Sequence, residues 1–388
     1  MQAIERGVLV LQSTPFCNID CKYCYLPDRS NKKQMTLSLV ERVIDEVVNS
    51  GVFRDGFAIN WHAGEPLVLP ATFYRDCLTI TDRYQTEKFE IRHIFQTNGT
   101  LIDETWCDFF KQPNVYVGVS VDGPAALHDV NRVDRRGRGT FAQVERGLSM
   151  LRSHRITFGV LSVITYNHLD HAEEMFEFLC STGAHDAIFN FEEVEGPHKY
   201  SSFSKPDAII KFKEFIRKIF ALNRQRGSPL TFLNLNFDLL GVNGTLQNNQ
   251  TTPWAIITVD CDGNVCTFSP ELMGTKDPYY SNFVLGNLLK DPIERIAAGI
   301  PYQRLATEIN QGLERCRREC DYFGWCGGGA PSNKYFENGS FDSTETIYCR
   351  FMRKALCDVN FELLEQKVQA KCGQDHVDAT HHSTFDVA

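Results

Sequence analysis

The first two thirds of the chain alternate between short runs of Val, Ile and Phe and longer stretches that carry one apolar stripe. Runs with the length of a buried parallel strand lie at 7–12, 57–61, 91–97, 115–121, 157–164 and 187–191. Helical spacing of apolar residues separates these runs, as in Val40, Val43, Ile44, Val47 and Val48, and again in Phe212, Phe215, Ile216, Ile219 and Phe220. The pattern predicts an α/β fold built from repeated strand–helix units.

Six such units in succession favour a barrel or partial barrel, with its chemistry on the loops that follow the strands. An open, doubly wound sheet is the alternative, because periodicity does not distinguish the two. After about Gly227 the alternation stops and the chain becomes rich in Asn, Gly, Pro and Cys. We therefore expect a barrel over 1–227, a smaller and loop-rich domain over 228–369, and a flexible tail over 370–388.

Composition excludes several classes of protein. The 388 residues include 40 Lys plus Arg against 49 Asp plus Glu, which gives a net charge of −9 and no electrostatic footprint for nucleic acid. No apolar run approaches the length of a membrane span, and the first residues lack the pattern of a signal peptide. We expect a cytoplasmic protein without a membrane or nucleic-acid partner.

Cysteine is abundant and unevenly distributed. The chain has 14 cysteines, and in a reducing compartment such a number favours metal or cluster ligation over disulfides. One group lies near the start and a second near the end, which predicts two metal regions. Cys77, Cys107 and Cys180 fall in helical segments and are expected to be small core side chains.

The first group, Cys17, Cys21 and Cys24, follows the first predicted strand directly. Three thiolates on one tight loop can hold three irons of a four-iron cluster and leave the fourth iron open to a ligand. A zinc loop, or three unrelated thiols, is the alternative.

The second group, Cys316, Cys320, Cys326 and Cys349, supplies four thiolates. Four ligands close the coordination shell of a four-iron cluster or of a structural zinc ion, and spacing alone leaves both possibilities open. Cys261 and Cys266 are candidates for a degenerate further site, and Cys357 and Cys372 have no assignment.

The Cys-x3-Cys-x2-Cys motif after the first strand resembles that of the radical S-adenosylmethionine (SAM) superfamily. The resemblance implies a partial, TIM-like (β/α)6 barrel, and a [4Fe–4S] cluster whose open iron binds SAM and cleaves it reductively to a 5′-deoxyadenosyl radical. The segment from His62 to Pro66 is similar to the family's Gly-Gly-Glu-Pro element, with Ala63 in place of the first Gly. Polar residues also follow the third and fourth strands, although Asn-Gly and Asp-Gly pairs are common turns. By this resemblance the expected SAM-site residues are Ala63, Gly64, Glu65, Pro66, Thr97, Asn98, Ser120, Asp122 and Arg132, although Arg132 could equally be an ordinary solvated arginine. Tyr23, directly before the last cysteine, is a further candidate, because its ring could pack over the cofactor or against the barrel rim.

The second cysteine tract resembles the SPASM extension of peptide-modifying radical SAM enzymes. The usual two-cluster pattern has further cysteines at the positions of Phe268 and Ala330, so we expect one auxiliary [4Fe–4S] cluster here. The segments 267–272 and 326–350 resemble the GrrM/OscB group of maturases. That resemblance implies a ribosomal precursor peptide as substrate and a three-residue cyclophane, in which an aromatic ring carbon is joined to a β-carbon, as product.

Such a reaction needs a proton acceptor and an electron donor. Glu271 and Glu192 are the candidate acceptors, although loop carboxylates are more often solvated. An external flavodoxin or ferredoxin is the expected donor. The alternatives are a radical SAM/SPASM enzyme that forms thioethers or formylglycine, and a non-enzymatic iron–sulfur electron carrier.

Overall fold

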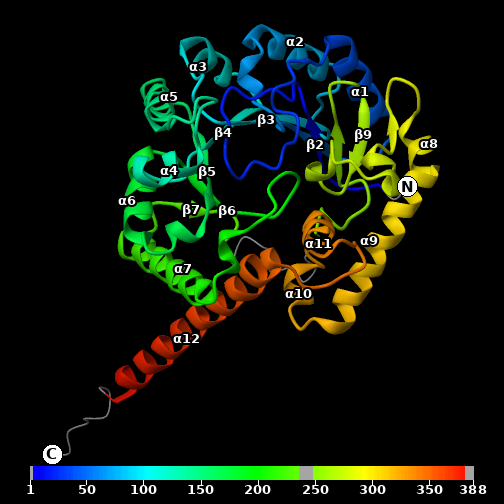
Figure 1. Ribbon diagram of the computed structural model, residues 1–388. Helices are drawn as coiled ribbons and strands as arrows, with labels where there is room; N and C mark the ends of the chain where they lie inside the picture. Colours follow the sequence, from blue (N-terminus) through cyan, green and yellow to red (C-terminus); the bar gives the residue numbers. More distant parts are fainter. Residues whose placement is uncertain (1–2, 236–247, 381–388) are drawn as a thin grey trace, which may run out of the picture.

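The computed structural model describes residues 3–235 and 248–380. All six predicted strands are present, and helices surround the sheet that they form (Figure 1). The strands are β1 (Gly7–Leu11), β2 (Gly56–Trp61), β3 (Glu90–Thr97), β4 (Val115–Ser120), β5 (Phe158–Ile164), β6 (Asp186–Phe191), β7 (Thr231–Phe232), β8 (Ile256–Val259), β9 (Asn264–Thr267) and β10 (Gly286–Asn287).

The order of the strands decides between the two predicted architectures. From β1 to β7 each strand pairs in parallel with the next one along the chain, so the winding never reverses as it would in a doubly wound sheet. The sheet ends at β7 on one side and β10 on the other. The fold is therefore a partial barrel, and its loops after β1 to β6 gather at one end.

The strands after residue 227 extend the same sheet. β8 pairs in parallel with β1, with Val8 opposite Ile256, and β9 and β10 continue outward in antiparallel pairs. The C-terminal part of the chain thus begins at the open edge of the barrel, next to the strand that precedes the first cysteine loop.

The helices are amphipathic, as the spacing predicts. Thr36 caps α1 by accepting a hydrogen bond from the Leu39 amide, and the apolar stripe of α1 is buried against the sheet. The main helices are α1 (Leu37–Asn49), α2 (Ala71–Asp82), α3 (Glu104–Phe110), α4 (Ala125–Asn131), α5 (Phe141–Ser153), α6 (Ala172–Thr182), α7 (Ala208–Gln225), α8 (Ile293–Ala298), α9 (Ile300–Glu319), α10 (Phe323–Cys326), α11 (Pro331–Asn338) and α12 (Leu356–Thr380).

Short 3-10 helices lie in the loops, and three of them matter for the site: η1 (Pro66–Val68), η3 (Ser202–Ser204) and η5 (Pro270–Leu272). A π-helical turn, η7 (Cys349–Ala355), leads into α12, which projects from the body of the molecule (Figure 1). α12 continues to Thr380 and so occupies part of the segment 370–388 for which a flexible tail is expected; residues 381–388 lie outside the described ones. In the described part of the chain, none of the helices has the length and apolar character of a membrane span.

Candidate active site

The first cysteine loop closes over the end of the barrel. The backbone amide of Cys17 donates to the Arg29 carbonyl at 3.1 Å, and that of Cys24 donates to the Cys21 carbonyl at 3.2 Å. The Arg135 guanidinium binds the Cys17 carbonyl through Nη2 at 2.7 Å. Cys17, Cys21 and Cys24 consequently line one cavity of about 110 Å³.

Most of the residues expected at the SAM site line this same cavity. They come from the ends of strands two to four and from the loop after α4, and comprise Ala63, Gly64, Glu65, Thr97, Asn98, Ser120 and Arg132. Asn98 directs Nδ2 toward Cys17 Sγ at 3.7 Å, and Arg132 directs Nη1 toward Cys21 Sγ at 4.0 Å. The structure thus brings predicted strand-end residues into contact with the predicted cysteines.

The loop after β2 has an unusual backbone. Ala63 has φ of 68°, in the left-handed region that favours glycine, and its carbonyl accepts a hydrogen bond of 2.7 Å from Gln12 Nε2. Gly64 follows with φ of 140°, and a Cβ there would lie 2.0 Å from the Thr14 carbonyl oxygen. Ala63 therefore adopts a positive φ that is unfavourable for alanine. Gly64 is required because a side chain at this position would collide with the Thr14 carbonyl oxygen.

Glu65 anchors this loop to the end of β3. Its carboxylate accepts hydrogen bonds from Thr97 Oγ1 at 2.6 Å, from the Asn98 amide at 2.8 Å and from the Leu67 amide at 3.0 Å. Burial raises its pKa to about 7, although these hydrogen bonds act in the opposite direction. Pro66 begins η1 directly behind it.

Arg132 is held by a buried ion pair. Its Nε atom lies 2.9 Å from Asp122 Oδ1, and Tyr23 donates a hydrogen bond of 2.5 Å to Asp122 Oδ2. Tyr23 also lies under the guanidinium, 5.5 Å from ring centre to Arg132 Cζ. Arg132 lines the cavity, whereas Tyr23 and Asp122 do not. The geometry therefore indicates that Tyr23 and Asp122 position the Arg132 side chain.

Sequence reasoning missed six residues that line the cavity: the apolar Ile19 and Leu26, and the polar Tyr25, Arg29, His62 and Gln96. Tyr25 Oη lies 3.0 Å from His62 Nε2, and Gln96 Nε2 donates to Ser120 Oγ at 2.9 Å. His62 and Gln96 both stand at or near strand ends, so the rule that selected Thr97 and Ser120 could have found them.

The four cysteines of the second group also share a cavity, of about 250 Å³. α9 carries Cys316, α10 ends at Cys326, and Cys349 opens the π-helical turn η7. The Lys334 ammonium of α11 lies 3.3 Å from Cys316 Sγ and 3.0 Å from the Gly312 carbonyl oxygen. Among residues 3–235 and 248–380, no group of His, Cys, Asp or Glu converges closely enough to hold a single metal ion.

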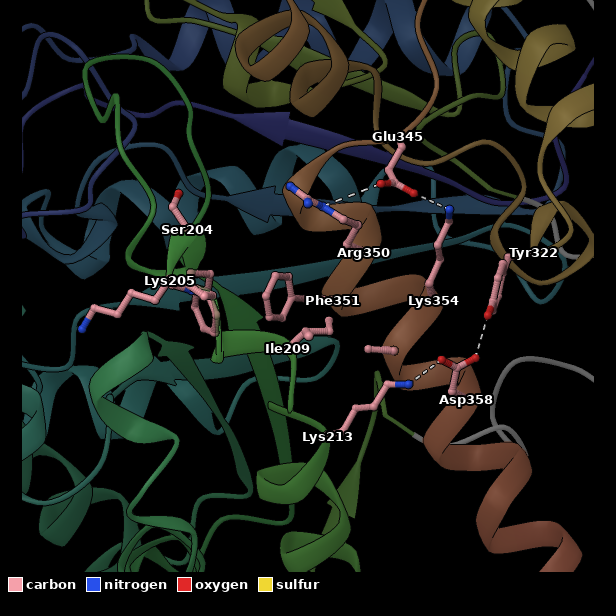
Figure 2. Close-up of a pocket in the computed structure, with 13 residues that line it drawn as sticks. Ser204, Lys205, Ile209, Lys213, Tyr322, Glu345, Arg350, Phe351, Lys354 and Asp358 are labelled. Carbon is pink, nitrogen blue, oxygen red and sulfur yellow. Dashed lines mark hydrogen bonds and ion pairs between the residues drawn. The ribbon is translucent and has the colours of Figure 1, made fainter. Parts of the chain in front are cut away.

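A third, more open cavity of about 580 Å³ lies beside this site (Figure 2). Figure 2 shows Arg350 and Lys354 directed at Glu345, while Lys213 and Tyr322 converge on Asp358 at 2.6 and 2.7 Å. These contacts tie barrel helix α7 to α12 and so brace the turn that bears Cys349.

Buried apolar side chains occupy the two positions at which the sequence resemblance would place cysteine in a two-cluster enzyme. Phe268 is 1% exposed and stacks on Tyr302, and Ala330 is 4% exposed at the start of α11. Cys266 is fully buried with its Sγ beside the carbonyls of Thr267 and Ser269. Cys77 and Cys107 lie in the core, as predicted.

Three carboxylates and an amide, here called the acid cluster, gather between the two cysteine sites. Its members are Glu193 and Glu195 after β6, Glu271 in η5, and Asn333 in α11. Asn333 Nδ2 lies 2.5 Å from Glu193 Oε2 and 3.3 Å from Glu195 Oε1. Burial raises the pKa of Glu271 to about 7 and that of Glu193 to about 8, and it raises the pKa of Glu195 as well.

Glu192, the other expected proton acceptor, has a different environment. Its carboxylate accepts hydrogen bonds from the Ser202 amide, at 2.8 Å, and hydroxyl, and it lies 3.4 Å from His198 Nε2. Burial alone would raise its pKa, but these partners lower it below the ordinary value. Glu193 and Glu195, which sequence reasoning missed, are the neighbours that join Glu271.

Tyr25 links the acid cluster to the first cysteine site. It lines the first cavity. Burial raises the pKa of Tyr25, and the largest further contributions come from the acidic groups Glu271, Cys24, Glu195 and Glu193. Gly196, with φ of 53°, lets the loop after β6 approach, since a Cβ there would lie 2.0 Å from the Tyr25 carbonyl oxygen. The acid cluster therefore adjoins the cavity of Cys17, Cys21 and Cys24.

Comparison with known proteins agrees with this geometry. The model of the radical SAM superfamily matches residues 11–179, which include the first cysteine loop and the ends of β1 to β5. An uncharacterized protein of Synechocystis, sll1766, is 40% identical over 371 residues, and the alignment covers 93% of each chain. The chain belongs to the radical SAM superfamily. It is an enzyme, like its relatives of known activity.

One of those relatives is a serine-type anaerobic sulfatase-maturating enzyme of Bacteroides thetaiotaomicron. It is 26% identical over 366 residues, which cover 88% of this chain and 86% of the relative. Two solved structures share the fold. The enzyme anSMEcpe with bound AdoMet and Cp18Cys peptide has a TM-score of 0.72 at 22% identity, with 95% of this chain and all 100% of that chain covered. Streptococcus suis SuiB bound to precursor peptide SuiA has a TM-score of 0.63 at 14% identity, with 88% and 75% covered.

Radical SAM enzymes of this type bind SAM and [4Fe–4S] clusters, including auxiliary clusters. The first cavity fits the cluster and SAM, because three thiols share one wall and the polar groups of Asn98 and Arg132 point at two of the sulfurs. Burial raises the pKa of the Cys17 and Cys21 thiols to about 12. A bound cluster would oppose this rise, because its irons bind the thiolate form. The second cavity fits a fully ligated cluster, with the Lys334 ammonium as a counter-charge.

Proposed function

We propose that this radical SAM enzyme installs a carbon–carbon crosslink, a three-residue cyclophane, in a ribosomally made precursor peptide. The observation that carries the proposal is the pair of buried apolar residues, Phe268 and Ala330, where two-cluster maturases have cysteines. They leave the cavity of Cys316, Cys320, Cys326 and Cys349 as the site of a single auxiliary cluster. A closed four-thiolate cluster can accept an electron, but it has no open iron at which to bind substrate.

The comparisons support a peptide as the substrate. One structural neighbour holds a Cp18Cys peptide together with AdoMet, and another holds its precursor peptide SuiA. Both match most of this chain in fold. We infer that this chain likewise takes a precursor peptide at the open end of its barrel.

When bound, SAM and the first cluster would supply a 5′-deoxyadenosyl radical able to take a hydrogen atom from a β-carbon of the peptide. Cys17, Cys21 and Cys24 would hold the first cluster, while Arg132, fixed by Asp122, would bind the carboxylate of SAM. Glu65 fixes the backbone of the loop after β2, whose polar groups face the same cavity. These residues orient the reactants and exclude water.

The β-carbon radical would then bond to a carbon of the aromatic ring, and the ring would regain aromaticity by losing one electron and the proton of that carbon. Glu271 is the proposed proton acceptor, because it acts on Tyr25 and its Oε2 atom is buried with no hydrogen-bond partner among the described residues. The auxiliary site lies on the opposite side of the acid cluster, where Asn333 and Lys334 are consecutive residues of α11. We propose that the electron leaves through this site and that an external flavodoxin or ferredoxin supplies electrons to the first cluster.

Formylglycine synthesis is the second candidate. It is favoured by the identity of 26% over 366 residues with the sulfatase-maturating enzyme of Bacteroides thetaiotaomicron. The two reactions differ in the residue that is modified, since formylglycine arises from serine or cysteine and needs no aromatic ring. Thioether synthesis likewise requires a cysteine in the substrate.

The test is incubation of the reconstituted enzyme with SAM, dithionite and a candidate precursor encoded beside it, under nitrogen. The proposal predicts 5′-deoxyadenosine and a peptide lighter by two hydrogens per crosslink, with no fragmentation inside the three linked residues. Formation of S-adenosylhomocysteine would indicate methyl transfer and contradict it. A peptide modified only at Ser or Cys would favour the second candidate.

A further inference from the structure

The acid cluster brings together carboxyl groups that have no cationic partner in an ion pair. Burial has the largest effect on the pKa of Glu195. The next largest effects come from Glu193, Glu271, Ser332 and Glu337, of which three are carboxylic acids. In the described part of the chain, no lysine, arginine or histidine forms an ion pair with Glu193, Glu195 or Glu271. Burying carboxylates without a cation is unfavourable, so this arrangement is costly when the site is empty.

Arg353 is the cation that acts on the cluster from the side of the auxiliary site. Glu193 helps to raise the pKa of Arg353, but Tyr348, Cys326 and Cys349 have larger effects on it. Arg353 Cζ lies 5.6 Å from the centre of the Tyr348 ring. Among the described residues Arg353 forms no ion pair with Glu193, Glu195 or Glu271, and its own Nε atom is buried without a hydrogen-bond partner.

Two buried atoms of the cluster lack a hydrogen-bond partner. One is Glu271 Oε2, and the other is Oδ1 of Asn333, a residue that is 0% exposed. Asn333 uses its Nδ2 group for Glu193 and Glu195, which fixes the amide with its oxygen free. Both orphan atoms are acceptors, and buried acceptors without donors are rare. The missing partner is therefore a donor.

Two cavities adjoin the cluster through neighbouring residues. Tyr25 lines the cavity of the first cysteines, and Val194, between Glu193 and Glu195, lines a surface cavity of about 420 Å³. Tyr200, which is 85% exposed, borders the same surface cavity. A peptide lying across the end of the barrel would pass beside the cluster.

We infer that the acid cluster of Glu193, Glu195, Glu271 and Asn333 is a subsite for a positively charged side chain of the substrate peptide, a guanidinium or an ammonium. A cation that carries several N–H donors can donate to the orphan acceptors and can also stabilise the ionised carboxylates. A neutral donor would satisfy the acceptors but leave the charge. The inference rests on the proposed function, since it names the substrate class of that same site.

The test is to measure the binding of small blocked amino acids to the reconstituted enzyme by titration calorimetry, without dithionite. The probes are Nα-acetyl-arginine methylamide, Nα-acetyl-lysine methylamide and, as the neutral isostere of arginine, Nα-acetyl-citrulline methylamide. We expect at least one cationic probe to bind ten or more times as tightly as the citrulline compound. Preference for arginine over lysine would assign a guanidinium, and the reverse an ammonium.

The variants E271Q and E195Q keep the shape of the side chain and remove its charge. Each should weaken the favoured cationic probe at least fivefold, while E87Q, at an exposed position, should leave its affinity unchanged. A melting temperature within a few degrees of the parent shows that a variant is folded. One folded Glu variant is enough for the binding comparison. Equal affinity for arginine and citrulline compounds, no binding of any probe, or insensitivity to both variants would overturn the inference. Because no crosslink forms in this assay, its failure is distinct from failure of the crosslinking reaction.

Discussion

The Lys334 ammonium lies 3.3 Å from Cys316 Sγ, although both side chains are buried, with exposures of 4% and 7%. Its neighbour on α11, Asn333, contacts Glu193 and Glu195 of the acid cluster. One short helix therefore connects the auxiliary cysteine site to the carboxylates beside the first cavity.

Replacing this lysine should alter the auxiliary cluster. A positive charge that donates to a ligating sulfur favours the reduced, more negative state of a cluster, so K334M is expected to lower its midpoint potential by some tens of millivolts. Redox titration followed by electron paramagnetic resonance measures the change. K199M, at an exposed position, is the control. An unchanged potential in K334M would show that the contact with Cys316 does not persist in the loaded enzyme.

The iron content should separate the two cysteine sites. We expect about eight irons per chain after anaerobic reconstitution, the sum of two four-iron clusters, and about four in the triple variant C17A/C21A/C24A. The paired variant C77A, in the core, should retain all of them. Near zero iron in the triple variant would exclude the second site. A parent value near twelve would indicate a further cluster, for which Cys261 and Cys266 are the candidates.

The ion pair of Asp122 and Arg132 should be important for folding. Removing one partner of a buried pair leaves an uncompensated charge, so D122N is expected to cost about 3 kcal/mol or more. Neutralising Glu5, whose pair with Arg54 is exposed, should change stability little. Melting temperatures of the two variants measured side by side give the comparison, and equal small losses would contradict it.

The same pair predicts a pH dependence. Burial tends to raise the pKa of Asp122, but the nearby charges of Arg132, His128 and His168 place it below the ordinary value of 3.8. A depressed pKa means that the stabilisation is complete above about pH 4 and is lost as the pH falls through the folded-state pKa. The parent should therefore lose more stability than D122N between pH 5 and pH 3.

The acid cluster predicts the opposite sign. Its carboxyl pKa values are raised by burial, to about 7 for Glu271 and about 8 for Glu193, so the folded state holds protons that the unfolded state releases above 4.5. Without a bound cation, stability should fall as the pH rises from about 5.5 to about 8.5, and E271Q should reduce that fall. E192Q is the matched control, because the pKa of Glu192 is lowered and its charge is already satisfied. An identical pH profile in E271Q and the parent would contradict the raised pKa.

The hydrophobic pattern predicts the strands closely because each is buried and short, and the strand ends select most of the first cavity. The place of β8 beside β1 was not predictable, since pairing between distant segments leaves no local period. Glu193 and Glu195 were missed for a related reason: a carboxylate in a loop looks solvated until Asn333, from α11, is folded against it. The strained φ of Ala63 is equally invisible in the sequence, because it depends on the contact with Gln12.

The central claim is that the product contains a carbon–carbon bond at an aromatic residue. It is tested most directly with a precursor that contains no cysteine and carries deuterium on the β-carbon two residues after the aromatic ring. We predict that the reconstituted enzyme transfers deuterium from that carbon into 5′-deoxyadenosine, and that tandem mass spectrometry finds fragmentation blocked across the three residues. An unmodified cysteine-free peptide, beside a modified peptide that contains cysteine, would contradict the claim.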